Sequence, residues 1–284
     1  MLNVFTNKAA ITGAIAAYKL QKETVGFVPT MGALHQGHLA LVKKALLDTS
    51  FVVVSIFVNP TQFDNNDDLE KYPRTLDDDV KLLQTLSKNR ILVYAPSVFD
   101  IYQGKTVADS FNFDGLEFEM EGRFRTGHFD GVGTIVKRFF EIIKPQKAYF
   151  GEKDFQQLAI IKKMVQKHAI PVQVIGCPIY RESSGLAMSS RNTRLNPSCK
   201  AMAPFIYKTL ATVRDNFGTK RVEEMLEWVN NQFAKQDVLK LEYFIIADVE
   251  TLKPAQEKQE TKKYRAFIAV YADDVRLIDN IALN

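Results

Sequence analysis

The chain has 284 residues, 46% of them hydrophobic, which allows a large buried core and excludes a disordered protein. Its 37 basic and 33 acidic residues leave a net charge of only +4 without a long basic block, so neither a nucleic acid nor a membrane surface is required as a partner. The two cysteines, Cys177 and Cys199, are too few for a disulfide framework and lack a C-x-x-C spacing, which favours a reducing compartment.

The N-terminal run AAITGAIAAY (residues 9–18) could imitate a secretory signal peptide, because it is apolar and contains Ala-x-Ala. It is short, interrupted by Thr12 and Gly13, and preceded by one lysine, so we expect a first helix that packs on the domain. The most apolar run, FVVVSIFV (residues 51–58), is far below the roughly 20 residues that a membrane helix needs. We therefore expect a soluble cytoplasmic protein.

Short β-branched runs then alternate with segments of helical periodicity. The strand-like runs are TVGFVP, FVVVSIFV, ILVYAP, KAYFGEKD and VQVIGC, at residues 24–29, 51–58, 91–96, 147–154 and 172–177. Helices are predicted over about residues 37–48, 75–88, 130–143 and 155–168. Such alternation is typical of βαβ units, and continuous apolar strands fit a sheet covered on both faces. The pattern predicts an α/β fold with a doubly wound parallel sheet over residues 1–177.

The character of the chain changes after Cys177. A polar loop, YRESSGLAMSSRNTRLNP (residues 180–197), precedes two predicted helices, at about residues 198–216 and 221–235. Three strand-like runs follow at residues 241–248, 264–272 and 275–283, separated by a charged loop that we expect to be mobile. Residues 178–284 therefore read as a smaller α+β domain with an antiparallel sheet.

The stretch PTMGALHQGH combines glycines and two histidines between a predicted strand and a predicted helix. It has the Gly-x4-Gly spacing of a phosphate loop, but His38 and Leu39 stand where a Walker loop has Lys and Ser/Thr. A helix that starts near Gly37 would place His35 and His38 at its N-terminus, where backbone N–H groups and the helix dipole favour a phosphate. Two structural histidines, or a zinc site built on H-x-x-H, are the alternatives.

A second candidate is the loop LAMSSRN, which places Met188, Ser189, Ser190 and Arg191 in consecutive positions after a possible hinge at Gly185. Hydroxyl and guanidinium groups suit the oxygens of a transferring phosphate, and a flexible loop can close over it. Serine-rich loops are more often solvated turns, so this motif alone is weak.

The two motifs together resemble the HIGH and KMSKS pair of the class I nucleotidyltransferase superfamily. More closely, PTMGALHQGH, SIFVNPTQF, YPRTLDDD, EGRFRTGHFDGV, YFGEKDFQQL and GLAMSSRN resemble, in this order, the motifs of the pantothenate synthetase (pantoate–β-alanine ligase) family. They extend over residues 27–192, and RLIDN near the C-terminus also matches. The resemblance implies a Rossmann-like domain that binds ATP and pantoate, a pantoyl-adenylate intermediate, and release of AMP when β-alanine attacks. It also implies Mg²⁺ and a homodimer.

The resemblance also implies roles for individual residues. Positions expected to contact ATP are Met31, Gly32, Ala33, Leu34, His35, Gln36, Gly37, His38, Gly151, Glu152, Lys153, Asp154, Tyr180, Met188, Ser189, Ser190 and Arg191. Among them, His35, His38, Lys153, Ser189, Ser190 and Arg191 are expected to be catalytic, with His38 as proton donor. Gln62 and Gln157 match glutamines that bind pantoate, and Arg125 and His128 match a positive patch near the substrates.

These residue types also occur in proteins for ordinary structural reasons. Glutamines are usually surface residues, a Lys-Asp pair such as Lys153–Asp154 is usually an exposed ion pair, and His128 can be structural. His168 belongs to no motif and is expected at a helix C-terminus.

The acidic run TLDDDV could contact Mg²⁺, but acids favour a helix start without any metal, so no metal ligand is assigned. One departure from the family pattern is QFDNNDD, which leaves the conformation of residues 64–68 open.

Three alternative functions remain. Another adenylyl-transferring enzyme of the superfamily would use a different acceptor. A tRNA-charging enzyme is disfavoured by the modest charge and the lack of an evident anticodon-binding domain. A nonenzymatic nucleotide-binding module is disfavoured because His38, Lys153 and the MSSR residues are all present.

Overall fold

The computed structural model describes residues 2–63 and 66–284, without the side chains of residues 66–68. Contacts divide the chain into two compact units, which are described separately: Met1–Glu152 with Gln156–Pro178, and Lys153–Phe155 with Ile179–Asn284. That residues 1–177 and 178–284 are separate domains stays a prediction, because a division by contacts does not show that either part folds alone. Of the segment left open above, residues 64 and 65 lie outside the described residues, and Asn66 begins a helix.

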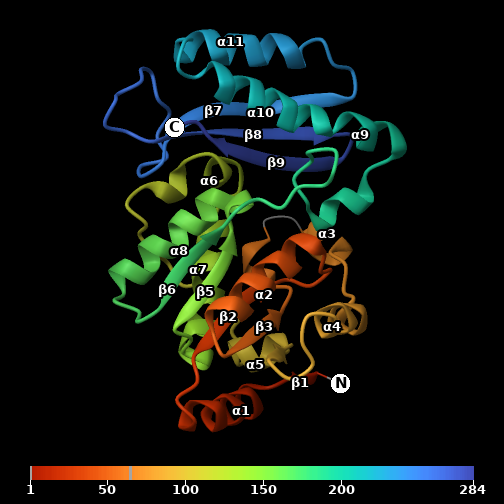
Figure 1. Cartoon of the computed structure of the whole chain (residues 1–284), viewed down its shortest axis with the longest axis vertical. Helices are drawn as coiled ribbons and strands as arrows, with labels where there is room; N and C mark the ends of the chain where they lie inside the picture. The colour runs from red at the N-terminus through yellow and green to blue at the C-terminus, as the bar shows by residue number, and fades with distance from the viewer. Residues whose placement is uncertain (1, 64–65) are drawn as a thin grey trace. The chain divides into compact units, whose positions relative to one another are not determined.

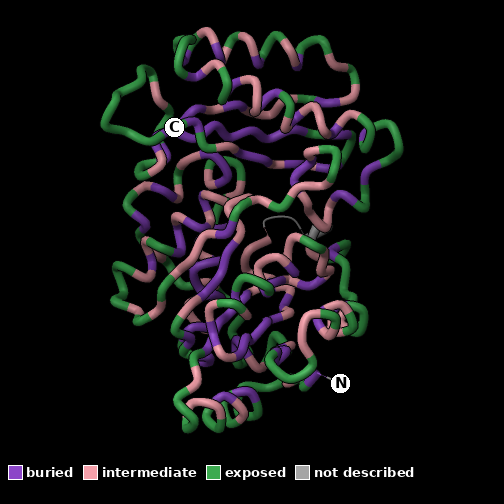
Figure 2. The backbone as a smooth tube through the Cα atoms, viewed as in Figure 1, coloured by how far each residue is buried: buried purple, intermediate pink, exposed green. Residues whose placement is uncertain are grey.

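The first unit contains a six-stranded, entirely parallel sheet in the order β1-β4-β3-β2-β5-β6 (Figure 1). Its strands are β1 (Asn3–Phe5), β2 (Val25–Thr30), β3 (Phe51–Ile56), β4 (Ile91–Tyr94), β5 (Lys147–Gly151) and β6 (Gln173–Cys177). Burial of nearly every residue of β2, β3 and β4 explains their continuous apolar sequences (Figure 2). The predicted fold class is confirmed. The sequence analysis missed β1, which has three residues and is too short for a periodic pattern.

Helices cover the sheet or connect its strands. They are α1 (Lys8–Leu20), α2 (Gln36–Asp48), α3 (Asn66–Lys71), α4 (Leu76–Gln84), α5 (Val98–Tyr102), α6 (Glu121–Phe124), α7 (His128–Ile143) and α8 (Phe155–Lys167), with 3-10 turns η1 (Pro60–Gln62), η2 (Leu116–Phe118) and η3 (Glu152–Asp154). The predicted strand over residues 147–154 ends at Gly151, because the charged residues that follow form η3. The predicted helix over residues 75–88 ends at Gln84, where the Thr85 hydroxyl donates to the Leu82 carbonyl and closes the last turn.

The order of the strands places a topological switch between β2 and β5. From β2 the chain moves to β3 and then β4 on one side, whereas β5 and β6 lie on the other. Within the described residues, β2 and β5 pair only through Gly26–Lys147 and Phe27–Ala148. Ligands of open α/β sheets bind in the crevice at such a point, beyond the carboxyl ends of the strands. PTMGALHQGH begins in the last two residues of β2 and GEKD begins at the last residue of β5, so both predicted ATP segments start at the switch.

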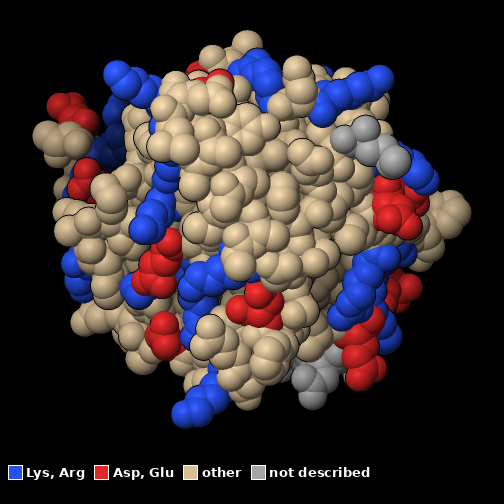
Figure 3. Space-filling view, turned by 90° about the horizontal axis from the view of Figure 1, so that it is seen from below, with Lys and Arg blue, Asp and Glu red and all other residues tan. Residues whose placement is uncertain are grey.

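The N-terminal apolar run forms α1, as predicted. The Asn7 side chain caps it by accepting from the Ala10 N–H, and Ile11 and Ile15 are its buried residues. No helix in the described ranges is long and apolar enough to cross a membrane. The face seen from below in Figure 3, where α1 lies, is largely uncharged at its centre, with basic and acidic side chains mixed around it.

The second unit packs helices on a three-stranded antiparallel sheet in the order β7-β8-β9. Its elements are the 3-10 turn η4 (Ser190–Arg194), helices α9 (Pro197–Met202), α10 (Pro204–Asn216) and α11 (Val222–Phe233), and strands β7 (Leu239–Asp248), β8 (Tyr264–Ala272) and β9 (Val275–Ala282). The single helix predicted over residues 198–216 is wrong. Pro204 has no N–H to continue the helical hydrogen bonds, so α9 ends and α10 begins there.

Candidate active site

The two histidines of PTMGALHQGH lie at the start of α2, in the predicted position. His35 is the N-cap residue, and its Nδ1 accepts a hydrogen bond from the Gly37 N–H (3.1 Å). The Nδ1 of His38 accepts from the His35 N–H (3.3 Å), which completes a reciprocal capping box. The ring centroids are 4.0 Å apart. The histidines therefore do have a structural role, as caps of α2.

This capping also determines which ring nitrogen carries the proton. A ring nitrogen that accepts a backbone N–H is unprotonated, so the proton of each neutral imidazole lies on Nε2. His35 and His38 thus each present an Nε2–H donor at a helix N-terminus, where the helix dipole favours an anion. Structural and phosphate-binding roles are compatible, since they use different nitrogens of the same ring.

One buried carboxylate holds the loop between β2 and α2. Gly32 and Ala33 both have left-handed backbone conformations, with φ of +86° and +50°. Asp79 in α4 is 2% exposed and accepts from the Ala33 N–H through Oδ2 (3.0 Å) and from the Leu34 N–H through Oδ1 (2.7 Å). A single side chain therefore sets the path by which the loop reaches His35.

The sequence analysis assigned no role to Asp79, although a signal was present. Asp79 is three residues after Leu76 and four before Leu83, so it lies on the apolar face of an amphipathic helix. An ionisable residue on such a face needs a buried partner. Here the partners are backbone N–H groups of a loop distant in sequence, which only the tertiary structure identifies.

We expect Asp79→Asn to lower the rate of the reaction at this site at least tenfold, because the amide can replace only one of the two acceptors and displaced catalytic groups lose rate steeply. Burial raises the pKa of Asp79, so its contribution to stability falls as the pH rises above the pKa of an unfolded aspartate. The neutral amide avoids this penalty. The melting temperature at pH 7 should therefore change little, and parallel losses of activity and melting temperature would contradict a positioning role.

Gln62 lies beside the histidine loop and is fixed from two sides. The Asn59 side chain, 1% exposed, donates to Gln62 Oε1 (3.2 Å) and to the Gly131 carbonyl (3.1 Å). The Gln62 amide in turn donates to Met31 Sδ (3.0 Å). The structure thus brings together two predicted site residues, Met31 and Gln62, which bond directly, and it holds Gln62 with an asparagine that the sequence analysis did not single out.

Arg125 and His128 approach Gln62 from the start of α7. His128 is 7% exposed, and its Nδ1 lies 2.7 Å from the Gln62 carbonyl oxygen, to which it donates. Arg125 Nη2 donates to the same carbonyl (3.3 Å), and Arg125 Nη1 lies 3.3 Å from His128 Nε2. In this structure the predicted positive patch holds the backbone of Gln62.

The two neighbouring glutamines of YFGEKDFQQL differ in their environment. Gln156 is 4% exposed and is bonded to the backbone of the segment around α6, at Leu116, Glu119 and Glu121. Within the described part of the chain, no hydrogen bond to the Gln157 side chain is found, and this residue is half-buried. Gln157, the predicted pantoate ligand, therefore has an amide available to a ligand, whereas Gln156 is structural.

In the second unit, Tyr180 and Met188 close a tight hairpin before the MSSR loop. The Met188 N–H donates to the Tyr180 carbonyl (3.0 Å), Arg181 pairs with Ala187, and Gly185 has φ of +92°. Ser189 then caps η4 by accepting from the Arg191 N–H (3.3 Å). The loop therefore follows directly on this hydrogen-bonded hairpin, and Ser190 and Arg191 lie within η4 itself.

Lys153 groups with the second unit and is only 19% exposed at its side chain. Its Nζ lies 3.5 Å from Asp154 Oδ1, so the predicted Lys-Asp ion pair exists. The half-burial of the lysine distinguishes it from an ordinary exposed pair.

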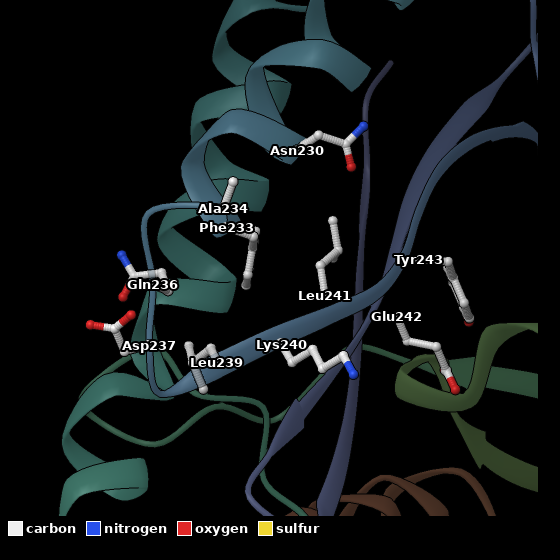
Figure 4. A pocket seen from close by; sticks show the side chains of 10 residues that line it. All are labelled: Asn230, Phe233, Ala234, Gln236, Asp237, Leu239, Lys240, Leu241, Glu242 and Tyr243. Carbon is white, nitrogen blue, oxygen red and sulfur yellow. The ribbon is translucent and has the colours of Figure 1, made fainter.

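A separate hollow in the second unit lies between the end of α11 and strand β7 (Figure 4). Its lining residues are Asn230, Phe233, Ala234, Gln236, Asp237, Leu239, Lys240, Leu241, Glu242 and Tyr243. No residue singled out from the sequence belongs to this lining, so we do not regard it as the active site.

The chain is similar to known proteins over almost its full length. A family model described as pantoate-beta-alanine ligase matches residues 3–282. The chain is 54% identical to a pantothenate synthetase of Christiangramia forsetii over 283 residues, covering 100% of both chains, and 53% identical to one of Flavobacterium psychrophilum, covering 99% of both. A crystal structure of pantothenate synthetase from Thermus thermophilus superposes with a TM-score of 0.91 at 38% identity, covering 99% of both chains.

A pantoate-beta-alanine ligase from Francisella tularensis, solved in complex with β-γ ATP and β-alanine, superposes with a TM-score of 0.82 at 35% identity. That comparison covers 100% of this chain and 98% of the other.

Proposed function

The chain belongs to the pantoate-beta-alanine ligase family, and from this premise we propose how its residues carry the reaction. It is an ATP-dependent ligase that joins pantoate to β-alanine. The observation that carries the proposal is the pair of Nε2–H donors of His35 and His38 at the N-terminus of α2, beside the topological switch of the sheet.

We propose that the reaction proceeds through pantoyl adenylate. A carboxylate oxygen of pantoate attacks the α-phosphorus of ATP, the bond from that phosphorus to the bridging oxygen breaks, and pyrophosphate leaves with the electron pair. The β-alanine nitrogen then attacks the acyl carbon, the bond to AMP breaks, and the amine loses a proton. Both steps redistribute negative charge on oxygen, so fixed donors aimed at those oxygens lower the barrier.

For the first step we assign the phosphate contacts to His35, His38 and Lys153 and to the loop residues Ser189, Ser190 and Arg191. His38 is the proposed proton donor, through its Nε2–H. The remaining residues of the three ATP segments are proposed to line the nucleotide, and Tyr180 contacts the adenine-bearing part of ATP through its backbone. Support for His35 and His38 comes from their tautomer, and support for Lys153 comes from its half-buried ammonium group.

We assign pantoate binding to Gln62 and Gln157. An amide offers a donor and an acceptor, which suits a substrate with hydroxyls beside a carboxylate. The contact of Gln62 with Met31 places it next to the ATP segment. Gln62 is also proposed to lie near β-alanine. We propose that Arg125 and His128 contribute positive potential and hold Gln62 by its carbonyl.

Mg²⁺ is proposed as a companion of ATP rather than as a resident ion. In the described part of the chain, no group of three or more His, Cys, Asp or Glu side chains could hold a metal. This fits Mg²⁺, which binds through phosphate oxygens and waters with few protein carboxylates. When bound, the ion supplies positive charge to the phosphates, and we assign it no protein ligand.

A direct assay tests this function. Purified protein is incubated with Mg-ATP and pantoate, with and without β-alanine, while pyrophosphate, AMP and pantothenate are measured. The proposal predicts pyrophosphate release that depends on pantoate, and AMP release that depends on β-alanine. Folded protein that ignores pantoate but responds to another carboxylate would instead indicate a different adenylyl-transferring enzyme.

We further propose that the protein is a cytoplasmic homodimer, as the family resemblance implies. Among the exposed large apolar side chains of the first unit are Leu20 (87% exposed) and Phe99 (75% exposed), which a second copy of the chain would shield from water if they lie in the interface. Light scattering coupled to size-exclusion chromatography would give the mass in solution, and a monomer mass at micromolar concentration would contradict the dimer.

A further inference from the structure

Four polar side chains with no role assigned above form a hydrogen-bonded group in the second unit. Arg265 on β8 is 9% exposed, and Asp279 and Asn280 on β9 are 4% and 2% exposed. Arg181, in the hairpin before the MSSR loop, completes the group. We call these four residues the β9 polar cluster. Buried polar groups are costly unless they are paired, so the groups with which they pair are informative.

One half of the cluster anchors the hairpin that carries the MSSR loop. Arg181 donates to both carboxylate oxygens of Asp279, at 2.6 and 3.0 Å, and also to the Gly185 carbonyl at the tip of the hairpin (3.1 Å). Its guanidinium lies over the Tyr207 ring at 3.8 Å. A bidentate pair fixes the direction of the arginine as well as its position. Asp279 therefore sets the base from which Met188 to Arg191 extend.

The other half anchors the segment that contains Lys153. The Asn280 amide donates to the Lys153 carbonyl (2.8 Å), while its Oδ1 accepts from Arg265. Arg265 also lies over the Phe155 ring, 4.1 Å from its centroid. The peptide of Lys153 and the ring two residues later are thus held by neighbouring residues of one sheet.

We propose that Asp279 and Asn280 are positioning residues, which fix the MSSR hairpin and the Lys153 segment relative to each other so that both can act on ATP. This inference rests on the proposed roles of Lys153 and the MSSR loop. The two residues are adjacent on β9, so one short stretch of strand bonds Lys153 and Arg181, which are 28 positions apart in the chain. It also gives a role to the last two residues of RLIDN, which matches the family pattern near the C-terminus.

The energetics favour positioning over stability as the reason for this arrangement. A buried ion pair contributes little net stability, because desolvation offsets most of the attraction. Burial raises the pKa of Asp279, against the opposing effects of Arg181 and, more weakly, Lys153. Keeping a buried carboxylate charged in this sheet therefore costs stability. What the carboxylate provides is a defined position for the groups that it binds.

Asn280→Asp tests the half that concerns Lys153. It keeps the size of the side chain and an acceptor for Arg265, but it replaces the donor to the Lys153 carbonyl with an oxygen. We expect kcat for pantoate-dependent pyrophosphate release to fall at least tenfold, with KM for pantoate within twofold of wild type. In a Lys153→Ala background the same change should cost less than about twofold, because there is no lysine left to position. If the double variant loses the product of the two single-variant losses in kcat, the two residues act independently and the inference is overturned.

Asp279→Asn tests the other half, with Glu242→Gln as its matched control. Glu242 pairs with Arg276 at 2.6 Å in the same sheet, its side chain is 14% exposed, and among the described residues it makes no hydrogen bond or ion pair with the predicted ATP segments. We expect Asp279→Asn to raise KM for ATP and lower kcat together by at least tenfold, and Glu242→Gln to leave both near wild type. The inference would be overturned if Asp279→Asn and Glu242→Gln changed kcat and KM equally. It would also be overturned if the kinetic loss in Asp279→Asn only followed a loss of melting temperature.

Circular dichroism shows whether each variant is folded. If Asn280→Asp does not fold, Asp279→Asn tests the inference, and if Asp279→Asn does not fold, Asn280→Asp tests it. Wild-type protein that releases no pyrophosphate with pantoate would instead refute the proposed function. Active wild type with unaffected variants would refute only the positioning role.

Discussion

His38→Ala is expected to lower the rate of pantoate-dependent pyrophosphate release by more than about tenfold. A fixed hydrogen-bond donor at a developing charge typically contributes about 10²-fold. The ring also caps α2 through Nδ1, so the variant should lose about 1 kcal/mol of stability while it keeps its fold. Stopped assays of pyrophosphate and a thermal melt measure the two effects separately.

Two further variants separate the nitrogens of this ring. In His38→Asn the side-chain oxygen can replace Nδ1 as the cap, but nothing reaches the Nε2 position. In His38→Gln a donor can reach close to Nε2. We expect the asparagine variant to recover stability without recovering the rate, and the glutamine variant to retain more activity. Near-normal pyrophosphate release by the asparagine variant would show that His38 acts only as a cap.

Gly131→Ala is expected to cause the largest loss among the substitutions far from the phosphate groups. A Cβ at Gly131 in α7 would lie 2.2 Å from the Thr61 carbonyl oxygen and 2.7 Å from Gln62 Cα. Backbone must move to admit it, and the displaced segment carries Gln62. We expect kcat/KM for pantoate to fall about 10²-fold, because small misplacements of binding groups are costly. Overpacking should also remove roughly 1–3 kcal/mol of stability, despite the better helix propensity of alanine.

Gly133→Ala is the matched control on the same helix. There a Cβ would lie 3.0–3.2 Å from ring atoms of Phe111 and Phe113, which are side chains that can shift. We expect less than a threefold change in kcat/KM for pantoate. Similar kinetics for both variants would mean that the approach of α7 to Thr61 does not position Gln62.

Patterns in neighbouring residues were sufficient to predict most strands and the start of α2. The strands are continuous apolar runs because the sheet is covered on both faces, and the start of α2 is marked by glycine and by polar N-terminal residues. His35 and His38 could therefore be placed at a helix N-terminus without a structure. The break at Pro204 was also readable, since proline cannot continue a helix, and it was missed because the flanking apolar pattern continues.

Several residues that hold the site could not be found in this way. Asp79 holds the histidine loop, Asn59 holds Gln62, and Asn280 holds Lys153, across separations of 45, 3 and 127 positions. Even the short separation of Asn59 and Gln62 is uninformative alone, because the same asparagine also binds the Gly131 carbonyl. Such pairs carry no periodicity and no composition signature.

The sequence by itself determined the fold class and the order of most elements, because side-chain type and local spacing specify those directly. It also indicated the candidate site residues, through the resemblance of its motifs to one family. Only the tertiary structure decided how the residues are held. Asp79 accepts from a distant backbone N–H, whereas His128 and Asn280 donate to distant carbonyls. Which of these groups meet depends on the order of the strands, and that order is set by packing of the whole sheet. The tautomers of His35 and His38 are likewise a result of their hydrogen bonds in the folded chain.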